Sequence, residues 1–209
     1  RDASMLPRGA SDRGGSGLAS YQIRTRQSGV LGNFEEPVIV NDADSSPERV
    51  RRLTIERGKT VCASVRAVDG VGHWSGWSDW SCVSRPLDQA SLKASGRWAP
   101  LKGRFFSEKK ALRAVDYRSA LSIRIGRTEA VSVTAVACSD CGRLEVRHRG
   151  QLLKVIDLSQ AGADRQGTAA GRHAKEFSVD WPASARGYLR LVSLGGGPVI
   201  IDGVTIQRR

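Results

Sequence analysis

The sequence predicts an all-β protein built of two β-sandwich domains. Short runs that alternate apolar and polar residues recur along the chain, turn-forming residues separate them, and no stretch keeps an apolar period of 3.6 residues. The length of 209 residues leaves room for two domains of about 100 residues each. Residues 87–95 lack alternation, so we expect this segment to be a linker between domains over 1–86 and 96–209.

The first half contains about five of the expected strands. In "ASYQIRTRQ" the residues Tyr21, Ile23 and Thr25 alternate with polar neighbours, as in a strand with one buried face. Turn-forming residues in "NDADSSPE" and "DGVG" separate the later runs. These runs are "PVIVN", "RVRRLTIE", "TVCASVRAVD" and the tryptophan-rich stretch "HWSGWSDWSC".

The second half continues the same pattern. Arg149–Gly150 lies between two alternating runs, as the turn of a tight hairpin would, and we expect a second such hairpin at "SLGGGPV". A domain of about seven to nine antiparallel strands over residues 96–209 is a sandwich or a jelly roll. The runs are "ALSIRIG", "EAVSVTAVA", "RLEVRHR", "QLLKVIDL", "EFSVDW", "GYLRLVSL" and "PVIIDGVTIQ".

The cysteines fall two in each half, as suits an exported protein with one disulfide per domain. Cys62 and Cys82 are equally far from Gly72, so a hairpin centred on that glycine predicts a cross-strand disulfide. For Cys138 and Cys141 we expect a small disulfide that closes a turn. A zinc site would need two further ligands and a redox site a helix N-terminus. These two roles and free thiols are the alternatives.

Three tryptophans, Trp74, Trp77 and Trp80, stand three residues apart. A polyproline-like segment has three residues per turn and would place them on one face, where guanidinium groups can lie between the indole rings. Such a ladder is either a structural clasp or a platform for a ligand, and we favour the clasp. The arginines expected to interleave are Arg24, Arg26 and Arg66.

The first half resembles a fibronectin type III (Ig-like) domain. Its sixth-strand pattern is matched by Val61, Ala63, Val65, Ala67, Val68 and Asp69, although Val61 replaces the usual tyrosine, and "WSGWS" resembles the Trp-Ser box of class I cytokine receptors. In those receptors the box ends the last extracellular domain, whereas here a second domain follows. Too little chain precedes Tyr21 for ordinary first strands. Either the domain is truncated, or residues 1–12 form an irregular substitute, which would leave an unpaired edge.

The second half resembles, more loosely, the carbohydrate-binding and galactose-binding-like jelly rolls that follow type III domains in exported proteins of actinobacteria. The resemblance rests on "GRW", on "SVTAVACSDCGRLEVRHRGQLLKVIDL" and on "GPVIIDGVTI". It implies a non-catalytic binding or spacer module. The aromatic residues that we select as candidate ligand contacts, with core packing as the alternative for each, are Trp98, Tyr117, Trp181 and Tyr188.

No catalytic motif accompanies the candidate acids and bases. The histidines His73, His148 and His173 stand beside no nucleophile motif. We interpret the acidic pairs Glu35–Glu36 and Asp42/Asp44 as solvated loop residues, and we place Asp202 in a turn, with calcium binding as its alternative. The sequence therefore predicts a protein that is not an enzyme and needs no cofactor.

The charge favours an anionic partner. The chain has 33 Lys and Arg against 21 Asp and Glu, a formal net charge of +12, and 26 of the cations are arginines. A GC-rich genome explains this bias as well as a selected phosphate-binding surface does. The basic residues form no stripe and no nucleic-acid motif, which disfavours a nucleic-acid partner. The sequence shows no membrane span and no signal-peptide core, so we expect any export signal to lie upstream or to have been removed.

Together these observations predict an extracellular, non-enzymatic binding or adhesion module of a cell-surface or wall-associated protein. We expect its second domain to contact a glycan or an acidic wall polymer. The alternatives are accessory or spacer domains of a larger secreted hydrolase, and a polyanion or nucleic-acid binder driven by charge alone. A protein partner stays open.

Overall fold

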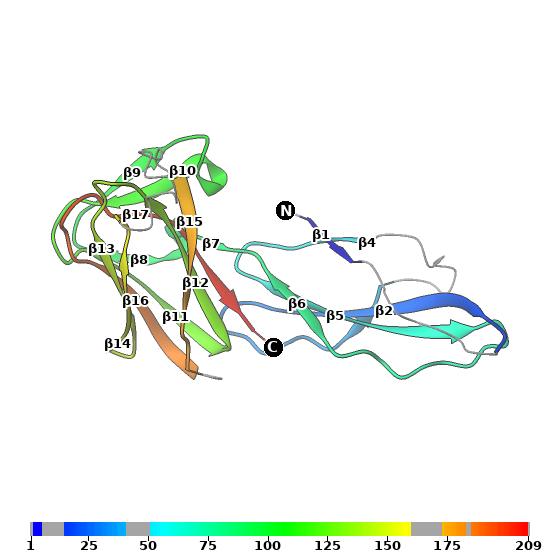
Figure 1. Ribbon diagram of the computed structural model, residues 1–209. Coiled ribbons are helices and arrows are strands. Elements are labelled where there is room, and N and C mark those ends of the chain that lie inside the picture. Colours follow the sequence, from blue (N-terminus) through cyan, green and yellow to red (C-terminus); the bar gives the residue numbers. More distant parts are fainter. Residues whose placement is uncertain (1, 6–14, 41–50, 160–172, 183–184, 209) are drawn as a thin grey trace. The chain divides into compact units, whose positions relative to one another are not determined.

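The computed structural model describes residues 2–5, 15–40, 51–159, 173–182 and 185–208, and these form β-strands, turns and two short 3₁₀ segments without an α-helix (Figure 1). The chain divides into two compact units, Arg1–Arg85 (unit 1) and Pro86–Arg208 (unit 2). Every sheet is antiparallel, as the alternating sequence pattern predicts.

Unit 1 contains a four-stranded sheet and a two-stranded sheet. The larger sheet has the order β3-β2-β5-β6 and the smaller one pairs β1 with β4. The expected irregular N-terminal segment is wrong for the part described, because Asp2–Met5 is a strand paired with Arg51–Thr54; residues 1 and 6–12 lie outside the described residues. The strands are β1 (Asp2–Met5), β2 (Leu18–Ser28), β3 (Val38–Ile39), β4 (Arg51–Thr54), β5 (Thr60–Asp69) and β6 (Ser81–Ser84).

The two faces of the larger sheet differ because side chains alternate along each strand. One face is apolar and buried, with Tyr21 and Ile23 on β2 and Val61 and Ala63 on β5. The other face carries arginines, since Arg24 lies opposite Ser64, and Gln22 opposite Arg66. The core of unit 1 therefore lies on one side of this sheet, and the other side carries polar and charged side chains.

Unit 2 is an antiparallel β-sandwich. One sheet has the order β15-β12-β17-β10-β9, with β7 also paired to β17, and the other has the order β14-β13-β16-β11-β8 (Figure 1). The elements are β7 (Leu87–Asp88), η1 (Gln89–Ser91), β8 (Lys93–Ser95), β9 (Trp98–Lys102), η2 (Ser107–Lys109), β10 (Lys110–Ala114), β11 (Ala120–Thr128), β12 (Ala130–Ala137), β13 (Arg143–His148), β14 (Gln151–Asp157), β15 (His173–Val179), β16 (Ala185–Ser193) and β17 (Ile200–Gln207).

Apolar residues from both sheets form the core of unit 2. Leu189 and Leu191 on β16 and Leu144 and Val146 on β13 are almost fully buried, as are valines of β12 and β17 in the other sheet. In each of these strands the intervening residues point away from the core. The sandwich thus presents the outer faces of its two sheets as separate surfaces.

Two local predictions for unit 2 are wrong. The expected linker 87–95 forms β7, η1 and β8, and β7 and β8 pair with β17 and β11. Its strands are too short to show alternation. The expected hairpin at "SLGGGPV" does not form, because β16 and β17 belong to different sheets. The glycines instead allow close packing: a Cβ atom on Gly197 would collide with the carbonyl oxygen of Asp140.

The predicted hairpin at Arg149–Gly150 is confirmed. Strands β13 and β14 pair directly, with His148 opposite Gln151. Both turn residues have positive φ, 50° at Arg149 and 87° at Gly150, which is the requirement of a two-residue type I′ turn.

Candidate functional site

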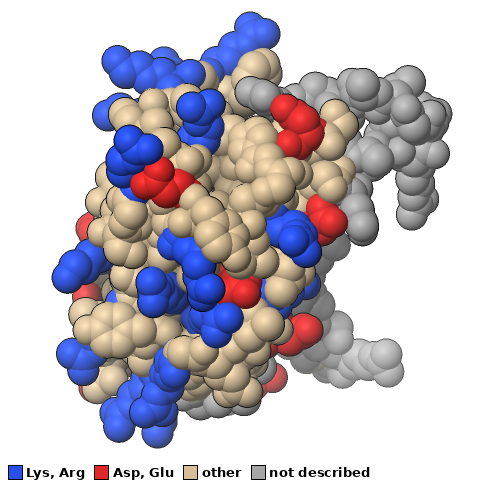
Figure 2. Space-filling model, turned by 90° about the vertical axis from the view of Figure 1, so that its left-hand side faces the viewer, with Lys and Arg blue, Asp and Glu red and all other residues tan. Residues whose placement is uncertain are grey.

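A groove of about 570 Å³ crosses the outer face of the β14-β13-β16-β11-β8 sheet, and we call it the arginine groove. Figure 2 views the molecule from the side on which this sheet lies in Figure 1; basic side chains are numerous there, and several acidic ones lie among them. The groove is lined by Ser95, Arg118, Ser122, Arg147, Arg149, Gly150, Tyr188, Arg190 and Val192. Four of these nine residues are arginines and none is acidic.

Strand alternation explains why these side chains reach solvent. On β16, Leu189 and Leu191 enter the core, so Tyr188 and Arg190 point outward. On β13, Val146 enters the core and Arg147 points outward. The register then sets Arg147 of β13 directly opposite Arg190 of β16, and Arg190 opposite Ser122 of β11.

One carboxylate beside the groove holds Arg147 in place. The Nε atom of Arg147 donates to Oε2 of Glu145 at 2.6 Å, and its Nη1 donates to the carbonyl oxygen of Gly150 at 2.9 Å. The hydrogen bond from Arg147 lowers the pKa of Glu145, and the charges of Arg147 and Arg118 lower it further. Glu145 is therefore ionised, and it orients Arg147.

Of the four aromatic residues selected from the sequence, Tyr188 alone lines the groove. Tyr188 is 60% exposed. Tyr117 is 65% exposed and directly precedes the groove residue Arg118 in the chain. Trp98 is half-buried, and its Nε1 donates to the carbonyl oxygen of Ser95 at 3.2 Å. The structure places Trp181 in the core instead, with its ring centroid 4.5 Å from that of His148.

In unit 1 the structure places the tryptophans and arginines in one alternating stack, the cation–π ladder. The guanidinium carbon of Arg66 lies 4.2 Å from the ring centroid of Trp74 and 4.7 Å from that of Trp77. Arg24 lies 4.3 Å from Trp77 and 4.7 Å from Trp80. Each arginine is thus held between two aromatic rings, an arrangement that favours a cation electrostatically.

The far end of the ladder contains a residue that sequence reasoning missed. Arg26 lies 4.4 Å from Trp80 and 4.4 Å from Phe34. Phe34 lies outside the regular spacing of the tryptophans, so no local pattern indicates it. Burial, and then the neighbouring charge of Arg24, lower the pKa of Arg26. The stack therefore holds three adjacent cations at some electrostatic cost.

Two serines attach the tryptophan segment to β5. Ser75 and Ser78 donate their backbone N–H groups to the carbonyl oxygens of Ala67 and Val65, at 2.9 and 2.8 Å. Their hydroxyl oxygens accept the backbone N–H groups of the same two residues. The serines thus take the place of a regular strand at this edge, and they keep the tryptophans on the arginine side.

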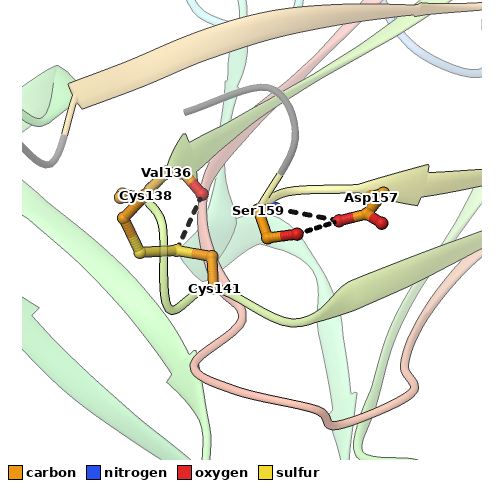
Figure 3. Close-up of a disulfide and its surroundings, with 5 residues drawn as sticks. All are labelled: Val136, Cys138, Cys141, Asp157 and Ser159. Atoms are coloured by element: carbon orange, nitrogen blue, oxygen red, sulfur yellow. Dashed lines mark hydrogen bonds between the residues drawn. A yellow bond between two sulfur atoms is a disulfide. The ribbon is translucent and has the colours of Figure 1, made fainter. Parts of the chain in front are cut away.

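Both predicted disulfides are present. Cys62 lies opposite Cys82 in the β5–β6 pair, with their Cα atoms 4.0 Å apart, and the two are bonded. Cys138 and Cys141 close a short turn after β12, where Cys141 Sγ approaches the carbonyl oxygen of Val136 at 3.6 Å (Figure 3). Asp140 lies close to these sulfur atoms, but both are committed to the disulfide.

Asp202 is not in a turn but inside β17, and it is only 3% exposed. Its Oδ2 accepts the backbone N–H of Ser107 at 3.0 Å, whereas its Oδ1 has no hydrogen-bond partner among the described residues. Burial, together with the charge of Asp88, raises the pKa of Asp202. Gln89 likewise has a buried Oε1 atom that lacks a described partner. These oxygens are of the type that binds Ca²⁺.

The other candidate acids and bases stay apart. His73 contacts Asp69 at 3.1 Å on an exposed loop, and His148 is buried near the carbonyl oxygen of Arg186. Exposed Glu35 accepts a hydrogen bond from Gln27 at 2.9 Å. Asp42 and Asp44 lie outside the described residues, and His173 begins β15.

No family model matches the chain, and no curated protein matches it. Solved structures with a similar fold include carbohydrate-binding modules and a glycoside hydrolase. One is CsCBM6-3 from Clostridium stercorarium in complex with cellobiose, with 15% identity, a TM-score of 0.42, and coverage of 59% of this chain and 93% of that one. Another is the carbohydrate-binding module CBM6cm-2 from Cellvibrio mixtus lichenase 5A in complex with cellotriose, with 12% identity, a TM-score of 0.42, and coverage of 59% and 96%.

A third similar structure is the exo-β-1,3-galactanase of Phanerochaete chrysosporium with galactose. It shares 12% identity with this chain at a TM-score of 0.43, and the match covers 71% of this chain and 41% of that one. Among the described residues no helix has the length and hydropathy needed to cross a membrane.

Proposed function

We propose that unit 2 is a non-enzymatic glycan-binding module of an exported protein and that the arginine groove is its binding site. The observation that carries the proposal is the groove itself, which lies on the outer face of a sheet and is lined by an exposed tyrosine, Tyr188. A sugar ring stacks on an aromatic face through its C–H groups, and its hydroxyls accept hydrogen bonds from side-chain donors. Tyr188 and the arginines supply both.

The scaffold supports this role. Five of the nine groove residues, Ser122, Arg147, Tyr188, Arg190 and Val192, lie on strands whose opposite sides are buried in the core, so a ligand meets positions that are already ordered. Disulfides in both units suit an oxidising extracellular location. Unit 1, in this proposal, is a supporting domain of the fibronectin type III kind, in which the cation–π ladder stabilises the sheet and does not bind the ligand.

Accessory or spacer domains of a larger secreted hydrolase are the second candidate for the chain as a whole. The two roles share the same groove chemistry and differ in what else the full protein carries. A third candidate, a polyanion binder driven by charge alone, follows from the net charge of +12. It predicts binding that depends on no particular groove residue.

Binding of the 209-residue chain to an array of neutral and acidic glycans, at low and at roughly physiological salt, tests the proposal. We expect selective binding to a small set of glycans that persists at the higher salt. Tyr188→Ala should weaken it without lowering the melting temperature, because this side chain is exposed. Absence of binding to every glycan would contradict the proposed function and favour a spacer.

A further inference from the structure

We propose that the arginine groove binds an anionic glycan, a linear polysaccharide whose carboxylate or sulfate groups bind between Arg147 and Arg190. This inference rests on the proposed function and specifies its ligand class. The evidence for it is the set of positive charges that the fold brings together on one face of the sheet.

The first support is the cross-strand pair of arginines. Arg147 and Arg190 lie directly opposite each other on β13 and β16, and both side chains line the groove. Like charges in directly opposite positions destabilise a sheet unless an anion lies between them. Glu145 binds Arg147 from one side, and no residue lining the groove is acidic. The charge of Arg118 also acts on Glu145, whereas Arg149 and Arg190 form no ion pair with a carboxylate among the described residues.

The second support is the contrast with other arginines of the chain. In unit 1, Arg24, Arg26 and Arg66 each lie between aromatic rings. Within the described residues, no aromatic ring lies over Arg118, Arg147, Arg149 or Arg190 at cation–π distance. Arg118, Arg149 and Arg190 are exposed, whereas Arg147 is half-buried and donates to Glu145 and Gly150. A carboxylate or sulfate ester can accept two parallel hydrogen bonds from one exposed guanidinium.

The third support is the direction of the charged row. Lys93 of β8 lies opposite Ser122 of β11, which lies opposite Arg190 of β16, which lies opposite Arg147 of β13. Neighbouring strands are about 4.8 Å apart, so this row extends roughly 14 Å across the sheet. A row of that length suits several successive units of a polymer better than one monosaccharide. Tyr188 lies on β16 next to this row, two residues before Arg190.

The test compares acidic polysaccharides with their own neutral forms. The probes are polygalacturonate and alginate with their carboxyl-reduced counterparts, and chondroitin sulfate with its desulfated form. Titration calorimetry with the 209-residue chain at roughly physiological salt measures each affinity. We expect at least one acidic glycan to bind about tenfold more tightly than its neutral form, since a hydrogen bond to a charged group is stronger than one to a neutral group.

Two matched variants locate the effect. Arg190→Gln should lower the affinity for that acidic glycan about tenfold and leave the melting temperature unchanged. Arg113→Gln removes the same charge from an exposed position on β10, in the other sheet, and should leave the affinity unchanged. Arg190→Lys keeps the charge and loses the planar donor group, so it should give an intermediate affinity.

The outcomes separate the two proposals. Equal affinity for the acidic and neutral forms would overturn the anionic inference and leave glycan binding intact. A loss of equal size from Arg190→Gln and Arg113→Gln, together with equally tight binding to duplex DNA, would also overturn it in favour of bare charge. Binding to neither acidic nor neutral glycans would overturn the proposed function itself, and with it this inference.

Discussion

The cation–π ladder of unit 1 and the arginine groove of unit 2 use the same residue types in opposite ways. In the ladder, each guanidinium lies between two rings at 4.2–4.7 Å, and the Nε atoms of Arg24 and Arg26 are buried. In the groove, arginines stand beside one exposed tyrosine and no ring covers them in the described structure. Arginines and aromatic residues are therefore stacked on one sheet and left unstacked on the other, as the two proposed roles require. The ladder and the groove differ in whether aromatic rings cover the arginines.

The largest effect that we expect comes from removing a central aromatic residue of the ladder. Trp77 contacts both Arg24 and Arg66, so Trp77→Ala leaves two cations without one of their rings. We expect unit 1 to lose about 3 kcal/mol of unfolding free energy, measured as a lower melting temperature in calorimetry, with glycan binding unchanged. Trp74→Ala is the matched control: Trp74 ends the ladder, contacts one arginine and is 43% exposed, so the loss should be smaller. Unchanged stability with lost binding would make the ladder a ligand platform.

An arginine-to-lysine exchange separates the two regions more finely. A lysine ammonium is compact and strongly hydrated and cannot stack flat between two rings. Arg24→Lys should therefore cost unit 1 about 1 kcal/mol, whereas Arg190→Lys should cost unit 2 no measurable stability. Thermal unfolding of both variants measures the difference. Equal losses would mean that the groove arginines are as firmly packed as those of the ladder.

A smaller effect, of opposite sign, should follow from neutralising Asp202. Burial raises the pKa of Asp202, so the folded state binds its proton more tightly than the unfolded state does. The stability of unit 2 should then fall as pH rises through the ordinary aspartate pKa of 3.8, and remain lower above the folded value. Asp202→Asn should raise the melting temperature near pH 7 and flatten its fall from about pH 4 upward.

A matched acid and one added ion serve as controls for Asp202. The hydrogen bond from Arg97 lowers the pKa of the partly exposed Asp116, so Asp116→Asn should lower the stability near pH 7 slightly. Added Ca²⁺ tests the alternative role of Asp202. If Ca²⁺ raises the melting temperature of the unsubstituted chain and not that of Asp202→Asn, the carboxylate holds a cation. In the presence of Ca²⁺ the substitution should then lower the melting temperature instead of raising it.

Local patterns predicted much of the fold. Alternation located the strands from Ala120 to Gln207, and equal distance from Gly72 paired Cys62 with Cys82. The three-residue spacing of the tryptophans predicted the face on which the arginines of β2 and β5 would meet them. These features depend on residues near in sequence, or on strands joined by one turn. Strands β7–β10 are short and contain Pro100 and exposed lysines, so their pairing partners, not their own sequences, define them.

The arginine groove could not be predicted in the same way. Alternation in "RLEVRHR" and "GYLRLVSL" does put Arg147 and Arg190 on the outer side of their strands. Alternation cannot show that β13, β16 and β11 are neighbours. These strands are not consecutive in the sequence, and only the strand order of the folded sheet makes them adjacent. Tyr188 was selected for its residue type alone. The arginines around it form the candidate site only once three separate strands are side by side.

The disulfide between Cys62 and Cys82 also determines how unit 1 responds to mechanical tension. Strand β6 leads through Arg85 directly to Pro86, the first residue of unit 2, so a pull transmitted along the chain enters unit 1 at the end of β6. The strand can detach from β5 only as far as the disulfide, which releases Val83, Ser84 and Arg85, or about 10 Å of extended chain. Beyond that point the load passes through a covalent bond to the central strand β5, and the serine-anchored tryptophan segment carries none of it. A pull through this junction would therefore bypass residues 63–81, which include all three tryptophans, until the bond is reduced.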